Sequence, residues 1–418
     1  MIAAKSLGSE RRTVGLIRTL LGFESVLYSV ITPLLPHYAR EFGVSKPAIG
    51  LLAAAYPAGM LPGSLLGGWI ATRAGVRRTT VVGLLLITAA IAPFGLGGSL
   101  AVLDSLRFIQ GIACGCIWGG GLAWVIAVAP RERRGEVLGS VIAAAIFGTI
   151  AGPVVGTLAV AVGTGVVFAC VGAVSLGLTI WTLEHDEPPR AALGGGAPFR
   201  AVLSSGRFLL GFWLVLLEAC TIGATGTLLP LRLSRFGASG VAIGLTFVLA
   251  SVLSAALTPW TGRVVDRRGT LVPLTAGLGL SAVLIALLPL PQSALLLAIL
   301  TIVALGGPLI AATMPAMSMM TEAVDQIGVA LVFGTMLLNV AWSLGETIGA
   351  PAAATLSRAT SDAIPLLALA GAMLATLVVV LAMRKRSRED EAVSSTSAPR
   401  WSDQAADPQA SRRVFQQR

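Results

Sequence analysis

Long apolar runs, separated by short clusters of charged residues, set the pattern of the whole chain. A helical run of about 20 apolar residues crosses the hydrocarbon core of a bilayer, which is about 30 Å thick. Reading from one charged cluster to the next predicts twelve such helices, at 14–36, 47–71, 79–97, 100–128, 136–160, 164–183, 207–231, 240–264, 271–290, 293–320, 328–356 and 363–383. The expected fold class is therefore an all-α membrane protein of twelve transmembrane helices.

The composition agrees with this pattern and excludes most soluble classes of protein. Of the 418 residues, 55% are hydrophobic and 12% are charged, whereas an ordinary soluble domain is about 25% charged. These values exclude a cytosolic enzyme, a secreted disulfide scaffold and a disordered chain. The four cysteines lie in apolar runs and the chain has two histidines, so we expect no disulfide framework, no metal site and no cofactor. No nucleophile with a base and no phosphate loop stands out, so we do not expect an enzyme.

The basic residues indicate how the chain lies in the membrane. A formal net charge of +10 could indicate nucleic-acid binding, but that function needs a basic face with a supporting motif, and none stands out. With the N-terminus inside, the basic clusters fall on the cytoplasmic connections, as the positive-inside rule requires. They lie at 5–18, 73–78, 131–134, 190–207, 263–268 and 384–388. We therefore expect a multi-pass protein of the plasma (inner) membrane, with both termini in the cytoplasm and no nucleic acid as partner.

Two parts of the chain repeat each other at a constant offset of 194 residues, so that Glu24 matches Glu218 and 42–51 matches 236–245. This register indicates two pseudo-symmetric six-helix bundles in parallel topology, which normally enclose a site near the midplane. The alternative is a duplication that serves only as scaffold. The predicted domains are a cytoplasmic N-terminus (1–12), a first bundle (13–183), a cytoplasmic linker (184–206), a second bundle (207–383) and a disordered cytoplasmic tail (384–418).

Six short motifs stand out in the predicted loops and helices. They are the loop sequences GGWIATRAGVRR (67–78) and GRVVDRRG (262–269), and the helix sequences FESVLYSVITPLLPHY (23–38), RFIQGIACG (107–115), GTIAGPVVG (148–156) and NVAWSLGETIGAP (339–351). Together they resemble the major facilitator superfamily. Within that family they are similar to the twelve-helix drug:proton antiporter branch, which includes multidrug exporters and vesicular amine transporters. Asn339 stands where that branch often has Asp.

The resemblance implies the major facilitator fold and assigns gating roles. In the family, the two loops form cytoplasmic latches between helices, and the glycine motif of the fifth helix prevents leakage across an antiporter. Thr72 stands where the family usually has Asp, so we expect the first latch to be weaker or rebuilt. The alternatives are a solvated charge cluster for the loops and helix packing for the glycines. The residues so assigned are Gly68, Arg73, Gly75, Arg77, Gly148, Gly152, Pro153, Gly156, Asp266, Arg267 and Gly269.

Charged side chains inside the predicted helices are few, and each is costly to place in a membrane. Glu24 lies about ten residues, or roughly 15 Å, into the first helix, which places it near the midplane. Glu218 lies at the equivalent depth of the seventh helix. Burial favours the neutral form of a carboxyl group and a nearby cation favours its charged form, so a group under both influences can exchange a proton for a cationic substrate. The alternative for both is a neutral or paired carboxyl group that fixes helix packing.

Glu346 and Arg107 complete the set of embedded charges. Glu346 contacts either the substrate or a structural hydrogen-bond partner. Arg107 resembles the proton-coupling arginine of the family, oriented by Gln110; the alternative is a local pair with Asp104, one turn earlier. If all three acids face one cavity with Arg107, the site carries excess negative charge and favours lipophilic cations. Further candidates for the cavity lining are Tyr28, Asn339, Trp118, Trp124, Trp213 and Trp342. The alternative for the tyrosine and the tryptophans is helix packing or an anchor at the membrane interface.

These features predict a proton-coupled efflux transporter for hydrophobic, cationic small molecules, working by alternating access. Its partners would be the small-molecule substrate, protons and the lipid bilayer, and we expect a monomer. Two alternatives stay open on the same fold, namely an uptake symporter or facilitator for a small metabolite and a lipid-handling flippase. We expect the acidic run Glu184, Asp186 and Glu187 to be a solvated part of the linker.

Overall fold

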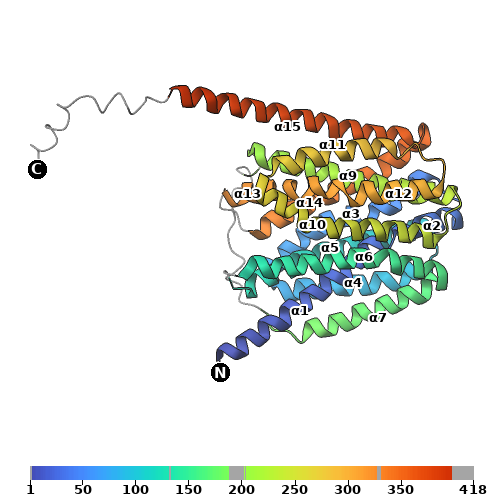
Figure 1. Ribbon diagram of the computed structural model, residues 1–418. Helices are drawn as coiled ribbons and strands as arrows, with labels where there is room; N and C mark the ends of the chain where they lie inside the picture. Colours follow the sequence, from blue (N-terminus) through green and yellow to red (C-terminus); the bar gives the residue numbers. More distant parts are fainter. Residues whose placement is uncertain (1, 131–132, 188–201, 203, 327–330, 398–418) are drawn as a thin grey trace, which may run out of the picture. The chain divides into compact units, whose positions relative to one another are not determined.

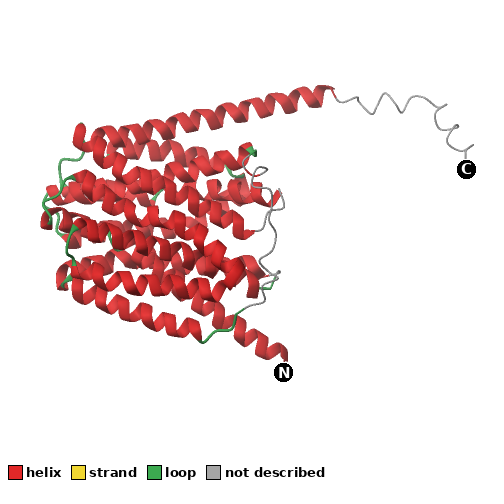
Figure 2. Ribbon diagram, turned by 180° about the vertical axis from the view of Figure 1, so that it is seen from behind, coloured by secondary structure: helices red, strands yellow, loops and turns green. Residues whose placement is uncertain are grey.

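The computed structural model describes residues 2–130, 133–187, 202, 204–326 and 331–397. Within these residues the regular structure is helical and contains no strand (Figure 2). The first six predicted spans correspond to α1 (Ile2–Ser29) with η1 (Thr32–Leu34) and α2 (Leu35–Glu41), α3 (Lys46–Ala74), α4 (Val76–Leu96), α5 (Leu100–Val128), α6 (Arg134–Val162) and α7 (Thr164–Leu183).

The later spans follow in the same order. They correspond to α9 (Gly206–Arg235), α10 (Gly240–Arg268), α11 (Leu271–Leu287), α12 (Ala294–Gly306) with α13 (Pro308–Gln326), α14 (Leu331–Ala359) and α15 (Ala363–Ser397). In the described residues, ten segments are long and apolar enough to cross a membrane, and α11 is a shorter apolar helix. The protein therefore has the expected all-α membrane fold, and its described helices lie at the positions of all twelve predicted spans.

Proline explains why two of the spans are broken. A proline ring lacks the backbone N–H and clashes with the carbonyl group four residues earlier. Pro33 is the second residue of η1 and Pro36 the second residue of α2, so the first span ends in two short helices. Pro308 opens α13 after Gly307, which has non-helical backbone angles and separates α12 from α13. These breaks were not part of the expected spans.

The last helix is longer than expected. The sequence predicts a helix to residue 383 and a disordered tail from 384, but α15 continues to Ser397. Residues 384–392 include four Lys or Arg, two Glu and one Ala, which are strong helix formers, so the helix has no local reason to stop at 383. Residues 398–418 lie outside the described residues. By contacts, the chain divides into two compact units, Met1–Leu374 and Ala375–Arg418.

Within the first unit, the helices run alongside one another (Figure 1). The helix α1 packs on α6, α5 packs between α3 and α4, and α4 packs on α7. Among the later helices, α9 packs on α13 and α14, α10 on α12, and α11 on α13. The pairs α3–α14 and α6–α10 join helices that precede the linker to helices that follow it. The domain limits expected from the repeat stay a prediction.

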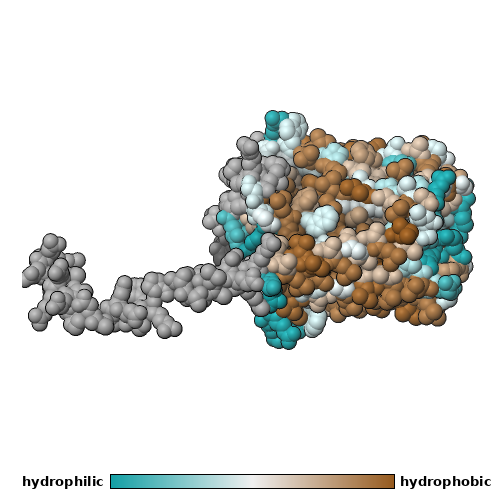
Figure 3. Space-filling view, turned by 90° about the horizontal axis from the view of Figure 1, so that it is seen from above, coloured by the Kyte–Doolittle hydropathy of each residue, from teal (hydrophilic) through white to brown (hydrophobic). Residues whose placement is uncertain are grey.

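The surface is apolar where the lipid lies. Large hydrophobic side chains are exposed along most of the helices, for example Leu65, Leu158, Leu249 and Leu295. On the face shown in Figure 3, hydrophobic residues cover the middle, and hydrophilic residues gather towards the two ends. This distribution matches the hydrocarbon core and the two aqueous sides of a bilayer.

Candidate functional site

A cavity of about 360 Å³ lies between helices from both parts of the repeat. Its volume falls in the range of sites for drug-sized molecules. The lining is mostly apolar or uncharged and comes from η1, α1, α3, α6, α9, α10, α13 and α14, with one residue each from α2, α5 and α12. Its charged groups are Arg107, Glu218 and Glu346, and Tyr28 and Trp342 line it beside Glu346. Four of these had been expected at the site or in its proton coupling, and Trp342 had been expected at the cavity.

Glu346 on α14 is hydrogen-bonded to a residue of α1. The hydroxyl group of Tyr28 on α1 donates a hydrogen bond to the carboxyl group of Glu346 on α14. The indole N–H of Trp342, one turn earlier on α14, donates to the same hydroxyl oxygen at 3.4 Å. Glu346 is buried, so this contact satisfies a carboxyl oxygen that water cannot easily reach.

Arg107 is buried and held by backbone carbonyl groups. Its guanidinium group donates to the carbonyl oxygens of Leu27 (3.0 Å) and Tyr28 (3.4 Å) and to the amide oxygen of Gln110 (3.1 Å). It also lies over the ring of Tyr56, 4.4 Å from the centroid, in a cation–π contact. These contacts hold the cation beside the end of α1, and its bond to Gln110 is compatible with the predicted orienting role.

The alternative pairing of Arg107 does not occur. Within the described part of the chain, Arg107 forms no ion pair with Asp104, and one carboxyl oxygen of Asp104 has no hydrogen-bond partner. Arg107 points towards α1, and Glu24 and Glu346 are the two acids that interact with it electrostatically. Its charge therefore acts on Glu24 and Glu346 and not on Asp104 of its own helix.

Glu24 lies behind the cavity wall. Its side chain is 1% exposed, and one carboxyl oxygen accepts a hydrogen bond from the indole N–H of Trp118 at 2.5 Å. The other oxygen has no partner among the described residues. Glu24 is not part of the cavity lining, so the condition that all three acids face one cavity is not met.

Glu218 occupies the equivalent position in the repeat but a different environment. It lines the cavity, and one carboxyl oxygen accepts a hydrogen bond from the hydroxyl group of Thr313 on α13. Its other oxygen is buried without a partner in the described part of the chain. Thr313 was not expected at the site. The sequence feature that points to it is its position as a polar residue in a mostly apolar span, close to the helix break at Pro308.

Several residues expected at the cavity lie elsewhere. Trp124 is fully buried in the core of α1–α7, and Trp213 is 45% exposed on the outside of α9. Asn339 is half-buried but does not line the cavity. These three corrections share one cause: a helical sequence fixes the depth of a residue, while the rotation of the helix decides which neighbour its side chain meets.

The glycine motif of α6 brings that helix into close contact with α1. A Cβ atom at Gly148, Gly152 or Gly156 would lie about 2 Å from Gly22, Ser29 or Val30 of the first span. Pro153 leaves the carbonyl oxygen of Thr149 without its helical partner. The hydroxyl group of Ser29 donates to that oxygen at 3.0 Å, so α1 repairs the bond that Pro153 removes.

The first motif loop contacts the start of the linker. The carboxyl group of Glu187 accepts a hydrogen bond from the backbone N–H of Arg77 at 3.3 Å and pairs with its side chain at 4.0 Å. Arg77 also donates to the carbonyl oxygens of Leu183 (3.3 Å) and His185 (2.9 Å). Glu187 is therefore not a solvated linker residue. It supplies an acid at the loop in which Thr72 replaces the usual Asp.

The remaining motif residues lie as follows. Gly75 has a φ of 99° and lies directly against the carboxyl group of Glu187, where a side chain would clash. Arg73 is exposed and stacks over Trp69 at 4.5 Å. Gly68 faces Met336 of α14. In the second copy, Arg267 and Gly269 are exposed, and the side chain of Asp266 lies outside the described residues.

Comparison with known proteins identifies the family of this architecture. The sequence model of the Major Facilitator Superfamily matches residues 20–346. A chloramphenicol resistance protein of Streptomyces lividans is 28% identical over 365 residues, which cover 84% of this chain and 90% of that protein. An uncharacterized MFS-type transporter of Schizosaccharomyces pombe is 25% identical, covering 62% of this chain and 66% of that protein. A quinolone resistance protein of Staphylococcus aureus is 25% identical, covering 40% of this chain and 43% of that protein.

Proposed function

Because the chain belongs to the Major Facilitator Superfamily and is therefore a multi-pass membrane transporter rather than an enzyme, we propose that it exports hydrophobic, cationic small molecules in exchange for protons. The observation that carries this proposal is the composition of the cavity. Two buried carboxyl groups, on Glu218 and Glu346, share a mainly apolar lining with one guanidinium group. A ligand that satisfies this lining has an apolar body and a positive charge.

Proton coupling follows from competition for carboxyl groups. A buried carboxyl group without a cation close by is most stable in its protonated form, and a bound cation favours the charged form. Glu346 is reached from the cavity and from Arg107, and Glu24 interacts with Arg107 from behind the wall. In the proposed mechanism, arrival of the cationic substrate releases protons from these acids, and arrival of protons from the other side releases the substrate.

Alternating access gives this exchange its direction. The cavity is exposed to one side of the membrane at a time as the two six-helix bundles rock about it. A membrane potential contributes about 2.3 kcal/mol per charge per 100 mV to each cycle that moves net charge. The relatives named for chloramphenicol and quinolone resistance support the direction of export. The proposal places the protein in the plasma membrane as a monomer with both termini in the cytoplasm.

The test uses purified protein in liposomes with an imposed pH gradient and tetraphenylphosphonium as substrate. We expect the cation to move against the proton flow. Glu24→Gln and Glu218→Gln should abolish this gradient-driven movement. Glu322→Gln is the matched control because Glu322 is an exposed acid paired with Arg207.

Three results would reject parts of the proposal. Unchanged gradient-driven transport in Glu24→Gln contradicts its role in proton coupling. Movement of a metabolite together with protons identifies an uptake symporter. Movement of a labelled phospholipid between leaflets, with no transport of tetraphenylphosphonium, identifies a lipid flippase.

A further inference from the structure

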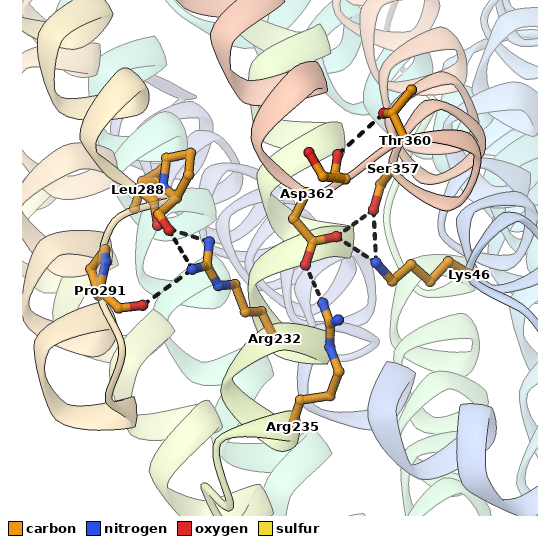
Figure 4. Close-up of polar contacts among 10 residues, drawn as sticks. Lys46, Arg232, Arg235, Leu288, Pro291, Ser357, Thr360 and Asp362 are labelled. Carbon is orange, nitrogen blue, oxygen red and sulfur yellow. Dashed lines mark hydrogen bonds and ion pairs between the residues drawn. The ribbon is translucent and has the colours of Figure 1, made fainter.

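Asp362, in the connection between α14 and α15, is the acceptor for three side chains (Figure 4). Its carboxyl group accepts hydrogen bonds from Lys46, Ser357 and Arg235. Lys46 also donates to the hydroxyl group of Ser357 at 2.8 Å. Asp362 is 13% exposed and Lys46 is 25% exposed, so water screens this pair less than it screens an ordinary surface pair.

The donors come from both parts of the repeat. Lys46 is the first residue of α3, whereas Arg235 ends α9 and Ser357 lies near the end of α14. Arg232, one turn before Arg235, donates to the backbone carbonyl oxygens of the connection between α11 and α12, at Leu288, Pro289 and Pro291 (Figure 4). The ends of α9, α11 and α14 are thus joined to one another, and Lys46 is the member of the cluster that belongs to the first half.

This cluster lies beyond the cavity along α3 and α14. These two helices pack closely, since a Cβ atom at Gly50 would meet Ala350 and Ala354 of α14. Ala350 lines the cavity, and Ser357 follows it by two turns, or about 10 Å along the helix axis. A second contact between the halves lies at the same end, where Arg40 donates to the hydroxyl group of Ser234 at 3.2 Å.

We propose that Asp362 holds the outer side of the transporter closed by binding Lys46, and that Arg235 keeps Asp362 paired when Lys46 moves away. The word "outer" rests on the orientation given under the proposed function. Opening this side separates the first half from the second, which breaks the contact of Lys46 and leaves that of Arg235 intact. A half-buried carboxylate left without any cation, and with only the hydroxyl group of Ser357 as a donor, would oppose opening. The shared carboxylate avoids this state, so the closure is reversible.

The two cations therefore have different roles, and substitution separates them. The reporter is Gly226→Cys, because Gly226 lines the cavity and a Cβ atom there meets open space. The background lacks the native thiols of Cys114, Cys116, Cys170 and Cys220. Labelling by a membrane-impermeant maleimide, added from outside to cells without substrate, measures how often the outer side opens.

We expect Lys46→Met to raise the labelling rate by about fivefold, and Arg235→Met to leave it unchanged or lower it. Lys46→Arg keeps the charge and the donors and should restore the original rate, which separates loss of the contact from misfolding. Labelling of Lys46→Met at the original rate, or an equal increase in Arg235→Met, would overturn the proposal. This assay needs neither substrate nor proton gradient. A negative labelling result therefore rejects the closure at Asp362 without rejecting proton-coupled export, and a negative transport result does the opposite.

Discussion

The hydroxyl group of Tyr28 on α1 donates a hydrogen bond to the carboxyl group of Glu346 on α14, so a single bond joins two helices of different halves at the cavity. A substrate cation that approaches Glu346 must compete with this donor. The hydrogen bond between Tyr28 and Glu346 in the empty cavity therefore weakens the binding of a cation to Glu346.

Replacing Tyr28 by Phe tests this competition. A hydrogen bond between neutral partners contributes about 1 kcal/mol net, which corresponds to about fivefold in affinity. We expect Tyr28→Phe to lower the Kd for tetraphenylphosphonium by about that factor, measured with purified protein. Tyr38→Phe is the matched control, since the buried hydroxyl group of Tyr38 has no partner among the described residues. Equal effects of the two substitutions, or weaker binding in Tyr28→Phe, would contradict this explanation.

The close contact between α6 and α1 predicts a difference between two glycines of one helix. A Cβ atom at Gly152 would lie 1.9 Å from Oγ of Ser29, whereas one at Gly139 would meet nothing within 4 Å. We expect Gly152→Ala to destabilise the protein by about 1–3 kcal/mol through overpacking. Gly139→Ala should stabilise it slightly, because alanine favours the helix. Thermal unfolding in detergent measures both, and a shared decrease in Tm would show that the contact is not responsible.

The contact of Glu187 with Arg77 predicts a salt-sensitive contribution to stability. Both side chains are about one-third exposed, so the expected loss in Glu187→Gln is small, about 0.5–1 kcal/mol. Glu184→Gln removes an exposed acid three residues earlier and serves as control. The difference in Tm between the two variants should disappear at about 1 M salt, where the Debye length is about 3 Å. A difference that persists there would point to a non-ionic cause.

The closure at Asp362 should withstand mild acid. Burial alone would raise the pKa of Asp362, but hydrogen bonds from Lys46 and Ser357 and the charge of Arg235 hold it below its ordinary value. A lowered pKa in the folded state means that the contribution of the carboxylate is present above the ordinary value of about 3.9 and is lost as the pH falls through the lower, folded value.

In a background that carries Glu24→Gln, Glu218→Gln and Glu346→Gln, external acidification from pH 7.5 to about 5.5 should therefore leave the labelling of Gly226→Cys unchanged, once corrected for the pH dependence of the reagent on a free thiol. A proton that drives transport must then act elsewhere than on Asp362. An increase in labelling over this range would show that Asp362 titrates at a higher pH than its contacts imply.

The sequence predicts the helices of this protein better than the faces that they present. Apolar runs between charged clusters locate the spans because a bilayer demands helical segments of a set length. The same pattern contains no information on rotation. Glu24 and Glu218 are equivalent in the repeat, yet one lies behind the cavity wall and the other lines the cavity.

Partners that are distant along the chain are the main part that could not be predicted. Tyr28 and Glu346 are 318 residues apart, and Lys46 and Asp362 are 316 apart. No local periodicity connects such positions. By contrast, the break at Gly307 is predictable from the Gly-Gly-Pro sequence, because a residue before proline disfavours helical geometry. This triplet divides the tenth predicted span into two helices.

The contact between Arg40 and Ser234 bears on how the two copies of the repeat diverged. The two residues are 194 apart, which is the offset of the repeat. Arg40 and Ser234 therefore occupy equivalent positions in the two halves. In a dimer of identical subunits, the same place would bring a residue against its own copy, either two arginines or two serines. A donor can face an acceptor at this place only after the two copies have diverged in sequence.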